Sequence, residues 1–453
     1  VLLYPYTYLK EMKKTYCLLL LFCCTILHLS AQLDTNKLNK YFTALDNNNK
    51  AMSSVCLYQK GLYTYDRAIG FADVSSKKKS NVYTQYRIGS ISKMFTAVII
   101  LQLIEEKMLG LQTTLDVFFP TLKNSHKITI EQLLNHRSGI ANFTKEESFR
   151  TYMETAKSDS ELIHIFEKLP SDFDPDSKYN YSNTGYVLLS MIIEKVTKSS
   201  YGMQLMRRIC FKAKLADTRV GIKINTSSNE AQSYAYENKE WVKTTETDMS
   251  IPHGAGNIVS TAKDLCLFIE ALFQGKLISE PTLQKMKTMK DGYGYGMVIM
   301  PFDGKQFYGH TGGIDNFQSM LGYNPMDSTA FCILGNGLNF EINDMAIALL
   351  NAVYNYPFEI PTFEKKLLSV AALQSIEGIY ENASIQMKIT LFTQNKKLWA
   401  QASGQSAFEL EKVSNLEYKN DAAGIKLILN KEKDNSIRIL TIKQGGHELK
   451  FEK

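Results

Sequence analysis

The sequence Gly89-Ser90-Ile91-Ser92-Lys93 stands at the head of a long stretch, residues 92–108, in which apolar side chains recur at helical spacing. The glycine at its start permits a sharp entry of the chain, and Gly110 suits the position just after the helix. We therefore expect Ser90 at the positively polarised N-terminal end of a helix, with Lys93 one turn further on the same face. A hydroxyl beside an amine in such a place has the setting of an activated nucleophile.

The pattern Ser-x-x-Lys occurs three more times in this chain, and the surroundings separate the four copies. The copies that begin at Ser75 and Ser76 lie in a polar, charged stretch that is typical of a solvated loop. The copy at Ser260 precedes an apolar run, where Thr261 and Asp264 indicate the capped start of a helix. Since Ser90 differs from all three, we predict that it is the nucleophile.

A second motif, Tyr181-Ser182-Asn183, lies on a tight loop before an expected helix at residues 184–197. On its own it is a common turn rich in Tyr and Asn. Together with the upstream pair it predicts a route for protons: a Tyr181 phenolate near Lys93 would take the Ser90 proton, return it to the leaving group and later activate water. Burial would lower the pKa of Lys93 and make its amine a proton acceptor at neutral pH.

A third motif, His310-Thr311-Gly312-Gly313, follows an expected strand at residues 306–309. Paired glycines on a strand indicate a close approach of backbone to ligand, so we predict that the amides of Ser90 and Gly313 form an oxyanion hole. Three side chains are predicted to bind or orient the substrate: Asn183, His310 and Thr311. The alternative for His310 is a hydrogen-bonded histidine with a structural role.

Composition and missing motifs narrow the function further. The chain has 453 residues, 44% apolar and 22% charged, so it is globular and long enough for two domains. It contains no His-Glu-x-x-His, Cys-x-x-Cys or Gly-x-Ser-x-Gly pattern, which argues against a zinc hydrolase and an α/β-hydrolase, and we expect no metal and no cofactor. Four cysteines beyond the first 31 residues are expected to be buried, free thiols: Cys56, Cys210, Cys266 and Cys332.

Residues 1–31 have the pattern of a secretory signal that is later removed. Met12-Lys13-Lys14 precedes an apolar run at residues 16–29 and then Ser30-Ala31, while residues 1–11 lie upstream of a possible initiator at Met12. We therefore expect export to the periplasm or medium, with no stable membrane span after removal. Removal takes away Lys10, Lys13, Lys14 and Glu11, which changes the net charge from +6 to +4, and the remaining lysines are scattered among acids. The chain thus shows no nucleic-acid footprint.

The order of expected elements predicts the fold class of residues 32–355. A helix at 34–47 and a strand hairpin at 54–71 come first, a mostly helical segment covers 111–223, and strands return between 295 and 335 before a closing helix at 341–354. Strands at both ends with helices between them favour an α+β domain, in which helices flank one antiparallel sheet and a helical subdomain is inserted. The three motifs would then meet where the sheet adjoins the helical insertion, a favoured place for ligands.

The last part of the chain changes character. Residues 356–372 contain Pro357 and Pro361 and are interpreted as a linker. Residues 373–453 hold short β-rich runs, separated by turns such as Asp421-Ala422-Ala423-Gly424 and Gln444-Gly445-Gly446. This pattern predicts a small all-β domain, either a barrel or a sandwich.

In this order and spacing the motifs resemble the class C β-lactamase and penicillin-binding-protein-like serine hydrolases, which include D,D-peptidases, D-aminopeptidases and esterases. The resemblance covers about residues 36–355, through residues 87–93, 133–139, 181–186, 254–265 and 309–313. It implies a β-lactamase/transpeptidase-like fold with Ser90 as nucleophile, Lys93 and Tyr181 as the proton-transfer pair, and Asn183 orienting Lys93 and the substrate amide. It also implies an oxyanion hole of the Ser90 and Gly313 amides. The C-terminal segment resembles small β-domains appended to many members.

Three positions depart from the pattern of that family. His310 stands where β-lactamases and D,D-peptidases usually carry lysine, Asp176 follows Pro175 where glycine is usual, and Asn316 stands where glycine is common. A neutral imidazole would bind a substrate carboxylate more weakly than a lysine does. We therefore expect neutral esters or amides to be better substrates than β-lactams, and His310→Lys to shift that preference.

The sequence thus predicts an exported serine hydrolase that cleaves an ester or amide of a small molecule or peptide, including a D-amino-acid peptide, through an acyl-enzyme on Ser90. The alternative is a catalytically silent sensor of penicillin-binding type, or a protein that binds cell-wall fragments. Turnover separates the two, because a silent protein would keep its adduct. The sequence selects no oligomeric state.

Overall fold

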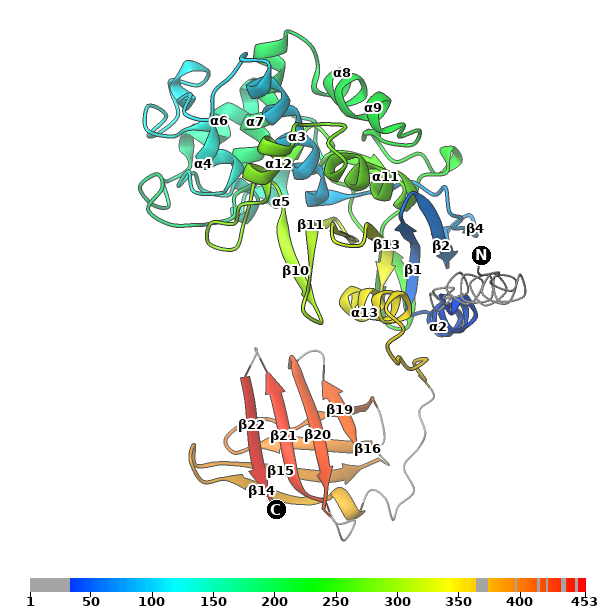
Figure 1. The fold of residues 1–453 in the computed structure, drawn as a ribbon. Coiled ribbons are helices and arrows are strands. Elements are labelled where there is room, and N and C mark those ends of the chain that lie inside the picture. The colour runs from blue at the N-terminus through cyan, green and yellow to red at the C-terminus, as the bar shows by residue number, and fades with distance from the viewer. Residues whose placement is uncertain are drawn as a thin grey trace, which may run out of the picture. The chain divides into compact units, whose positions relative to one another are not determined.

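The computed structural model describes residues 33–363 and 374–453, with short gaps at 396, 414–415, 421–422, 433–436 and 445–446. The chain divides into two compact units, Val1–Ile360 and Pro361–Lys453, which are described separately (Figure 1). The expected signal at residues 1–31 lies outside the described residues. So do residues 364–372 of the expected linker and the turn residues Asp421, Ala422, Gly445 and Gly446.

A six-stranded antiparallel sheet forms the centre of the first unit. Its strand order is β10-β11-β12-β13-β1-β2, so the first long strand pairs with the last, with Cys56 opposite Cys332. The strands are β1 (Ala51–Gln59), β2 (Leu62–Ile69), β10 (Val298–Phe302), β11 (Lys305–Ile314), β12 (Phe317–Asn324) and β13 (Thr329–Leu338). The predicted α+β class with one antiparallel sheet is confirmed. Strand β11, however, continues through the third motif instead of ending at residue 309.

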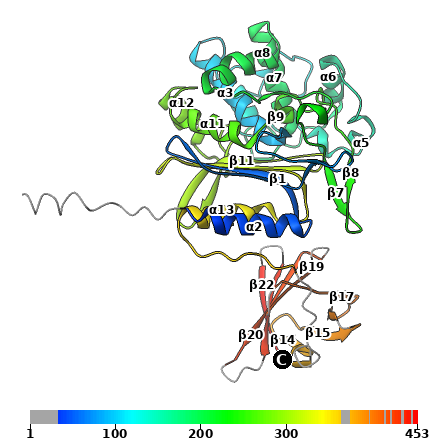
Figure 2. The same ribbon diagram turned by 90° about the vertical axis from the view of Figure 1, so that its right-hand side faces the viewer.

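Helices cover both faces of this sheet (Figures 1 and 2). Helices α2 (Thr35–Asn47) and α13 (Ile342–Val353) lie on one face, and α3 (Ser92–Glu105) and α11 (Ala262–Phe273) lie on the other. Every residue of α3 from Ser92 to Leu103 is buried, so this helix has no solvated face and fills the interior between the sheet and the other helices. It ends earlier than predicted, and Lys107, not Gly110, takes the left-handed conformation after it, at φ +59°.

The inserted helical part lies on the α3 side of the sheet (Figure 2). The segment at residues 111–223, expected to be mostly helical, contains α4 (Ile130–Leu134), α6 (Asp159–Lys168) and α7 (Asn183–Thr197), the last close to the helix expected at 184–197. Capping boxes at Thr129 and Ser158 start the first two. Further helices are α5 (Phe149–Tyr152), α8 (Tyr201–Leu205), α9 (Phe211–Ala213), α10 (His253–Gly256) and α12 (Glu280–Lys287).

Small strand groups connect the sheet to the helical part. A three-stranded sheet has the order β5-β9-β6, where β5 (Tyr86–Arg87) leads directly into the Ser90 segment. Its other strands are β6 (Arg219–Val220) and β9 (Ile258–Ser260), and two further pairs are β3 (Phe71–Asp73) with β4 (Lys78–Lys79), and β7 (Tyr234–Glu237) with β8 (Glu240–Lys243). Because β5 pairs with β9 over only two residues, the chain before Ser90 depends on side-chain contacts for much of its placement.

The second unit is one antiparallel sheet of nine strands in the order β17-β16-β15-β14-β22-β21-β20-β19-β18. The strands are β14 (Gly378–Asn382), β15 (Met387–Gln394), β16 (Lys397–Ala402), β17 (Phe408–Glu409), β18 (Glu411–Lys412), β19 (Glu417–Asn420), β20 (Ile425–Lys431), β21 (Ile437–Gln444) and β22 (His447–Glu452). The two edge strands, β17 and β18, are separated in the chain only by Leu410, so the sheet curls until its edges meet at one segment. Of the two predicted forms, barrel and sandwich, this is the nearly closed barrel.

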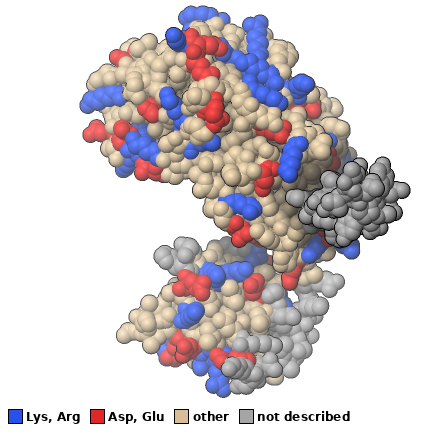
Figure 3. Space-filling view, in the orientation of Figure 1, with Lys and Arg blue, Asp and Glu red and all other residues tan. Residues whose placement is uncertain are grey.

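Charged side chains of both signs are interspersed over the face of the first unit in Figure 3. In the first unit, Arg208 and Glu106 form one ion pair through two hydrogen bonds of 2.7 and 2.8 Å. Exposed pairs of this kind add little to stability, so the unit depends mainly on its apolar core. The four cysteines named above are buried and free, as predicted. Within the described ranges, no helix is both long and apolar enough to cross a bilayer.

Candidate active site

Ser90 lies in a single 3₁₀ turn, η1 (Gly89–Ile91), that leads into the N-terminus of α3. Gly89 has φ +51°, and a Cβ atom there would lie 2.7 Å from the backbone nitrogen of Gly313. Both the conformation and the space therefore require glycine before the serine. The sharp entry expected from the sequence also presses the Ser90 turn against strand β11.

Lys93 is fully buried and its amine has three oxygen neighbours. Nζ lies 3.0 Å from Ser90 Oγ, 2.8 Å from Asn183 Oδ1 and 2.8 Å from the carbonyl oxygen of Ala255. A neutral amine has two N–H donors and one lone pair, and the two amide oxygens can only accept. With its N–H groups on those oxygens, the lone pair is left for the Ser90 hydroxyl. Burial holds the pKa of Lys93 well below its usual range, which favours this neutral form.

A chain of hydrogen bonds fixes the orientation of Asn183, the first residue of α7. Its Nδ2 donates to Thr144 Oγ1 at 3.0 Å, and that hydroxyl donates to Asn142 Oδ1 at 3.0 Å. Asn142 Oδ1 also accepts from the Asn183 backbone N–H at 3.1 Å. The amide therefore presents its oxygen to Lys93. Sequence reasoning missed Asn142 and Thr144, which no motif marks. It also missed the Ala255 carbonyl, although residues 254–265 carry part of the family resemblance.

Tyr181 lies close to both members of the Ser-x-x-Lys pair. Its ring centroid is 4.9 Å from Lys93 Nζ, and the Ser90 hydroxyl is close enough to lower the pKa of its phenol. Burial raises the pKa of Tyr181, and the Ser90 contact offsets this only in part. A phenol is thus the resting form at neutral pH, which disfavours the phenolate expected from the sequence. Lys93 is better suited to accept the first proton, with Tyr181 as a neutral relay.

The ring of His136 packs against that of Tyr181. Its ring lies 4.2 Å from the Tyr181 ring and 4.6 Å from that of Tyr293, measured between centroids. Nδ1 accepts from the Ser182 backbone N–H at 3.1 Å, and the residue has φ +59°. Burial, with further contributions from Lys93 and His310, keeps the pKa of His136 well below its usual range. The surroundings of Tyr181 are therefore aromatic and uncharged.

His310 does not take the substrate-facing position predicted for it. The side chain is buried, and both ring nitrogens are bonded within the protein: Nδ1 to the Thr311 carbonyl oxygen and Nε2 to the Tyr293 hydroxyl at 3.0 Å. A carbonyl oxygen only accepts, so Nδ1 carries the proton and Nε2 accepts from Tyr293. Burial and the nearby Lys93 lower the pKa of His310 to about 4. This histidine is the hydrogen-bonded structural alternative, and Thr311 beside it is exposed.

The third motif brings strand β11 against the Ser90 turn. Strand β10 pairs with β11 only as far as Gly309, so the other edge of residues 310–314 is open to η1. A Cβ atom on Gly312 would lie 2.1 Å from the Ile88 carbonyl oxygen and 3.1 Å from the Ser90 nitrogen. The segments that carry the Ser90 and Gly313 amides are therefore in direct contact, which suits the pair of donors predicted from the sequence.

A cavity of about 490 Å³ opens at Ser90, within the size range of small-molecule sites. Three of the predicted site residues line it: Ser90, Asn183 and Gly313. Lys93, Tyr181, His310 and Thr311 are not among its lining residues. The rest of the wall includes apolar Phe143, Phe149 and Met153 and two exposed charged residues, Arg150 and Glu154. Asp315, whose side chain is buried, and several threonines also line it.

The other two departures from the family pattern are accommodated locally. Asp176 has φ +66°, the left-handed conformation that a glycine would take, and its carboxylate pairs with Arg137 Nε at 2.6 Å and Lys290 Nζ at 2.7 Å. The turn is thus retained. Asn316 donates from its backbone N–H to Ser233 Oγ and from Nδ2 to the Tyr234 carbonyl oxygen, each at 2.9 Å, and lines the cavity.

A serine on the cavity wall with a buried lysine beside it, a tyrosine loop and a glycine strand on an α+β scaffold define the β-lactamase class of protein. The Beta-lactamase family model matches residues 40–353, and the chain belongs to this family. As a member, it is a serine hydrolase.

Known proteins similar to this chain include Penicillin-binding protein 4* of Bacillus subtilis, 24% identical over 91% of this chain and 97% of that protein. The Teichoic acid D-alanine hydrolase of Staphylococcus aureus is 26% identical over 55% of this chain, which spans only 62% of that protein. Among solved structures, the D-amino acid amidase of Ochrobactrum anthropi complexed with L-phenylalanine amide has a TM-score of 0.63 and 26% identity over 70% of this chain and 98% of that one.

Proposed function

We propose that this protein cleaves an ester or amide through a covalent acyl-enzyme on Ser90. One observation carries the proposal: the buried amine of Lys93 lies 3.0 Å from Ser90 Oγ while two carbonyl-type oxygens occupy its other donors. A neutral lysine held in this way is a base aimed at a single hydroxyl.

The proposed reaction has two halves. Lys93 takes the Ser90 proton as Oγ bonds to the substrate carbonyl carbon, and the oxygen that gains negative charge lies between the Ser90 and Gly313 amides. The bond to the leaving group breaks as that group receives the proton through Lys93 and Tyr181. Water then gives a proton back along the same route, attacks the ester carbon and releases the acid, which restores Ser90.

We propose a D-aminoacyl ester or amide as the substrate class. The names of two similar proteins contain D-alanine and D-amino acid, and such a group carries an ammonium next to the carbonyl that is attacked. The cavity holds a matching charge in Glu154, and Arg150 would suit an anionic leaving group. Within the described part of the chain, neither side chain has an ion pair or hydrogen bond of its own.

We further propose that the protein acts outside the cytoplasm. Support comes from the signal-like residues 12–31 alone. N-terminal sequencing of the protein from the cell exterior tests this, and a start at Gln32 is expected. Intact protein confined to the cytoplasm would contradict export.

The proposed reaction is tested with a fluorophosphonate probe and a nitrophenyl ester. Intact mass and peptide mapping should place one adduct on Ser90, and steady ester turnover should disappear in Ser90→Ala. An adduct elsewhere, or none, would show that the mechanism is wrong. A labelled Ser90 without turnover would instead support the silent, penicillin-binding type of protein. D-alanine and L-alanine nitroanilides then compare the proposed acyl group with its mirror image.

A further inference from the structure

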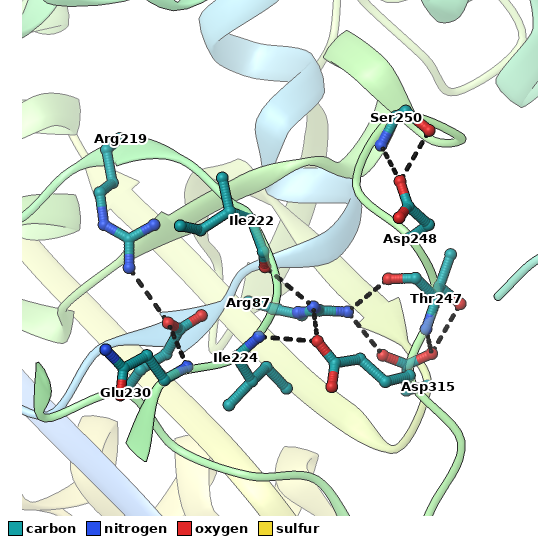
Figure 4. A network of polar contacts seen from close by, with 11 residues as sticks. Arg87, Arg219, Ile222, Ile224, Glu230, Thr247, Asp248, Ser250 and Asp315 are labelled. Atoms are coloured by element: carbon teal, nitrogen blue, oxygen red, sulfur yellow. Dashed lines mark hydrogen bonds and ion pairs between the residues drawn. The ribbon is translucent and has the colours of Figure 1, made fainter. Parts of the chain in front are cut away.

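Arg87, three residues before Ser90, is the centre of a buried polar network (Figure 4). Its guanidinium donates to the carbonyl oxygens of Thr247 at 2.7 Å and Ile222 at 3.2 Å. It also forms ion pairs with Glu246 at 2.8 Å and Asp315 at 3.1 Å. Removal of charges from water is costly and is tolerated where they are paired and hydrogen-bonded. The network therefore fixes the geometry of four chain segments.

Asp315 ties the end of β11 into this network. Its side chain is fully buried, with Oδ2 on Arg87 and Oδ1 accepting from the Thr247 N–H at 3.0 Å and the Thr247 hydroxyl at 2.6 Å. Its backbone has φ +51°, a conformation that an L side chain adopts only at a cost. Contacts on both carboxylate oxygens hold the residue there, two positions after Gly313.

The Ser90 segment and the end of β11 are thereby fastened side by side. Arg87 meets Asp315 at one end, and Gly89 packs against Gly313 next to it. Between these two contacts in the sequence, the Ile88 carbonyl oxygen lies against Gly312 and accepts a hydrogen bond from the Ser319 hydroxyl at 2.8 Å. Because the two segments carry the Ser90 and Gly313 amides, these contacts set the spacing of the two donors.

We propose that Arg87 and Asp315 are positioning residues for the oxyanion hole: their buried ion pair holds the Gly313 amide in place relative to the Ser90 amide. This inference rests on the proposed chemistry at Ser90. The pair acts through the backbone of β11, so its influence falls on the charged oxygen of the transition state and not on the bound ground state.

Arg87→Lys is the first test. The compact ammonium of a lysine keeps the positive charge but cannot replace the guanidinium on all four of its acceptors. We expect kcat for a nitrophenyl ester to fall by on the order of 10- to 10²-fold with KM changed less than about threefold. Backbone hydrogen exchange of residues 312–316 should also increase. Asp315→Asn keeps the shape of the side chain and should likewise lower kcat, change KM little and increase exchange. It replaces Arg87→Lys as the test if that variant does not fold.

Arg219→Lys is the matched control. Arg219 is another ion-paired arginine of the same three-stranded sheet, 3.1 Å from Glu230, but it lies away from the Gly313 segment and does not line the cavity (Figure 4). It should keep wild-type kcat and exchange. The inference is wrong if Arg87→Lys has the same kcat as the control, or if only its KM rises. Labelling of Ser90 by the probe would still support the proposed function in that case. If the fluorophosphonate probe does not label Ser90 in the wild-type protein, the proposed function is wrong. If, in addition, backbone hydrogen exchange of residues 312–316 is unchanged in Arg87→Lys, the positioning contact is wrong as well.

Discussion

Two buried basic side chains, Lys93 and Arg87, lie on either side of Ser90 in the chain and have opposite surroundings. All three oxygens around Lys93 belong to neutral groups, and burial lowers its pKa. Arg87 has two carboxylates among its four acceptors, and a guanidinium stays charged in proteins. The comparison teaches that burial alone does not decide whether a basic group is charged. The chemical type of the group and its counter-charges do, and here they separate a proton acceptor from a structural cation.

The largest effect is expected when Lys93 is made like Arg87. Lys93→Arg places a permanent cation among neutral oxygens and removes the base, so turnover of a nitrophenyl ester should fall by on the order of 10²- to 10⁴-fold. Steady-state kinetics measures this. Lys263→Arg is the control, since that lysine is partly exposed and paired with Asp66 at 2.6 Å. Turnover within a few fold of wild type would show that Lys93 is not the base.

The second prediction concerns removal of the positive charge of Arg87. Arg87→Met leaves Asp315 and Glu246 without their cation, and the loss of one partner from a buried pair costs roughly 3–5 kcal/mol of unfolding free energy. Denaturant unfolding of the single mutants and of the double mutant Arg87→Met/Asp315→Asn measures the coupling. The double mutant should be more stable than the sum of the single effects predicts. Simple additivity would mean that the ion pair contributes no coupling.

A pH series isolates a third buried base, His310. Burial lowers its pKa to about 4. Between pH 6.5 and 4, the imidazole is therefore protonated in the unfolded chain but neutral in the folded chain. Stability should fall as the pH falls through this window, by at most about 3 kcal/mol from this residue, and none of this loss is present above pH 6.5. His136 acts in the same direction. His310→Gln should therefore flatten only part of the slope in thermal unfolding.

His164→Gln, at a mostly exposed histidine, is the control for that series and should leave the slope unchanged. Equal slopes for His310→Gln and wild type would show that residue 310 is not the buried base described here. His310→Lys, expected from the sequence to favour carboxylate substrates, places an ammonium in the same buried position. We now expect lower stability from it and no gain for β-lactams.

The smallest effect concerns the exposed charges of the cavity. Glu154→Gln should raise KM for a D-alanyl nitroanilide by roughly tenfold, the loss of one hydrogen bond to a charged group. KM for the N-acetylated substrate, which has no ammonium, should not change. Glu147→Gln, on the exposed loop nearby, is the control. Equal increases for both substrates would show that Glu154 does not recognise the ammonium.

Local sequence patterns predicted those features of the fold and the site that depend on residues close together in the chain. The Ser90 turn, the buried Lys93 and helix α7 after Tyr181 follow from short-range spacing, and the single antiparallel sheet follows from the arrangement of β-rich and helical stretches. The position of His310 did not follow, because strand β11 continues through the third motif and turns that side chain inward against Tyr293. A periodic pattern cannot show where a strand containing three glycines ends.

Pairings between distant residues were outside the reach of the sequence. Arg87 was noted only as part of a motif, and its partner Asp315 lies 228 positions away with nothing in its neighbours to indicate an ion pair. Thr144, which orients Asn183 from 39 positions away, is an ordinary threonine in a turn. Tertiary contacts determine both roles, so a single chain without its fold cannot reveal them.

The pairing of β1 with β13 has a consequence for how the chain folds. Gln59 and Thr329 meet across these strands although 270 residues separate them. The central sheet therefore cannot be completed until nearly the whole first unit has been synthesised, and the large loop that must close makes folding slow. During this time the apolar strand β1 and the wholly buried helix α3 are exposed. A chain with this topology depends on protection from aggregation until its last sheet strand arrives.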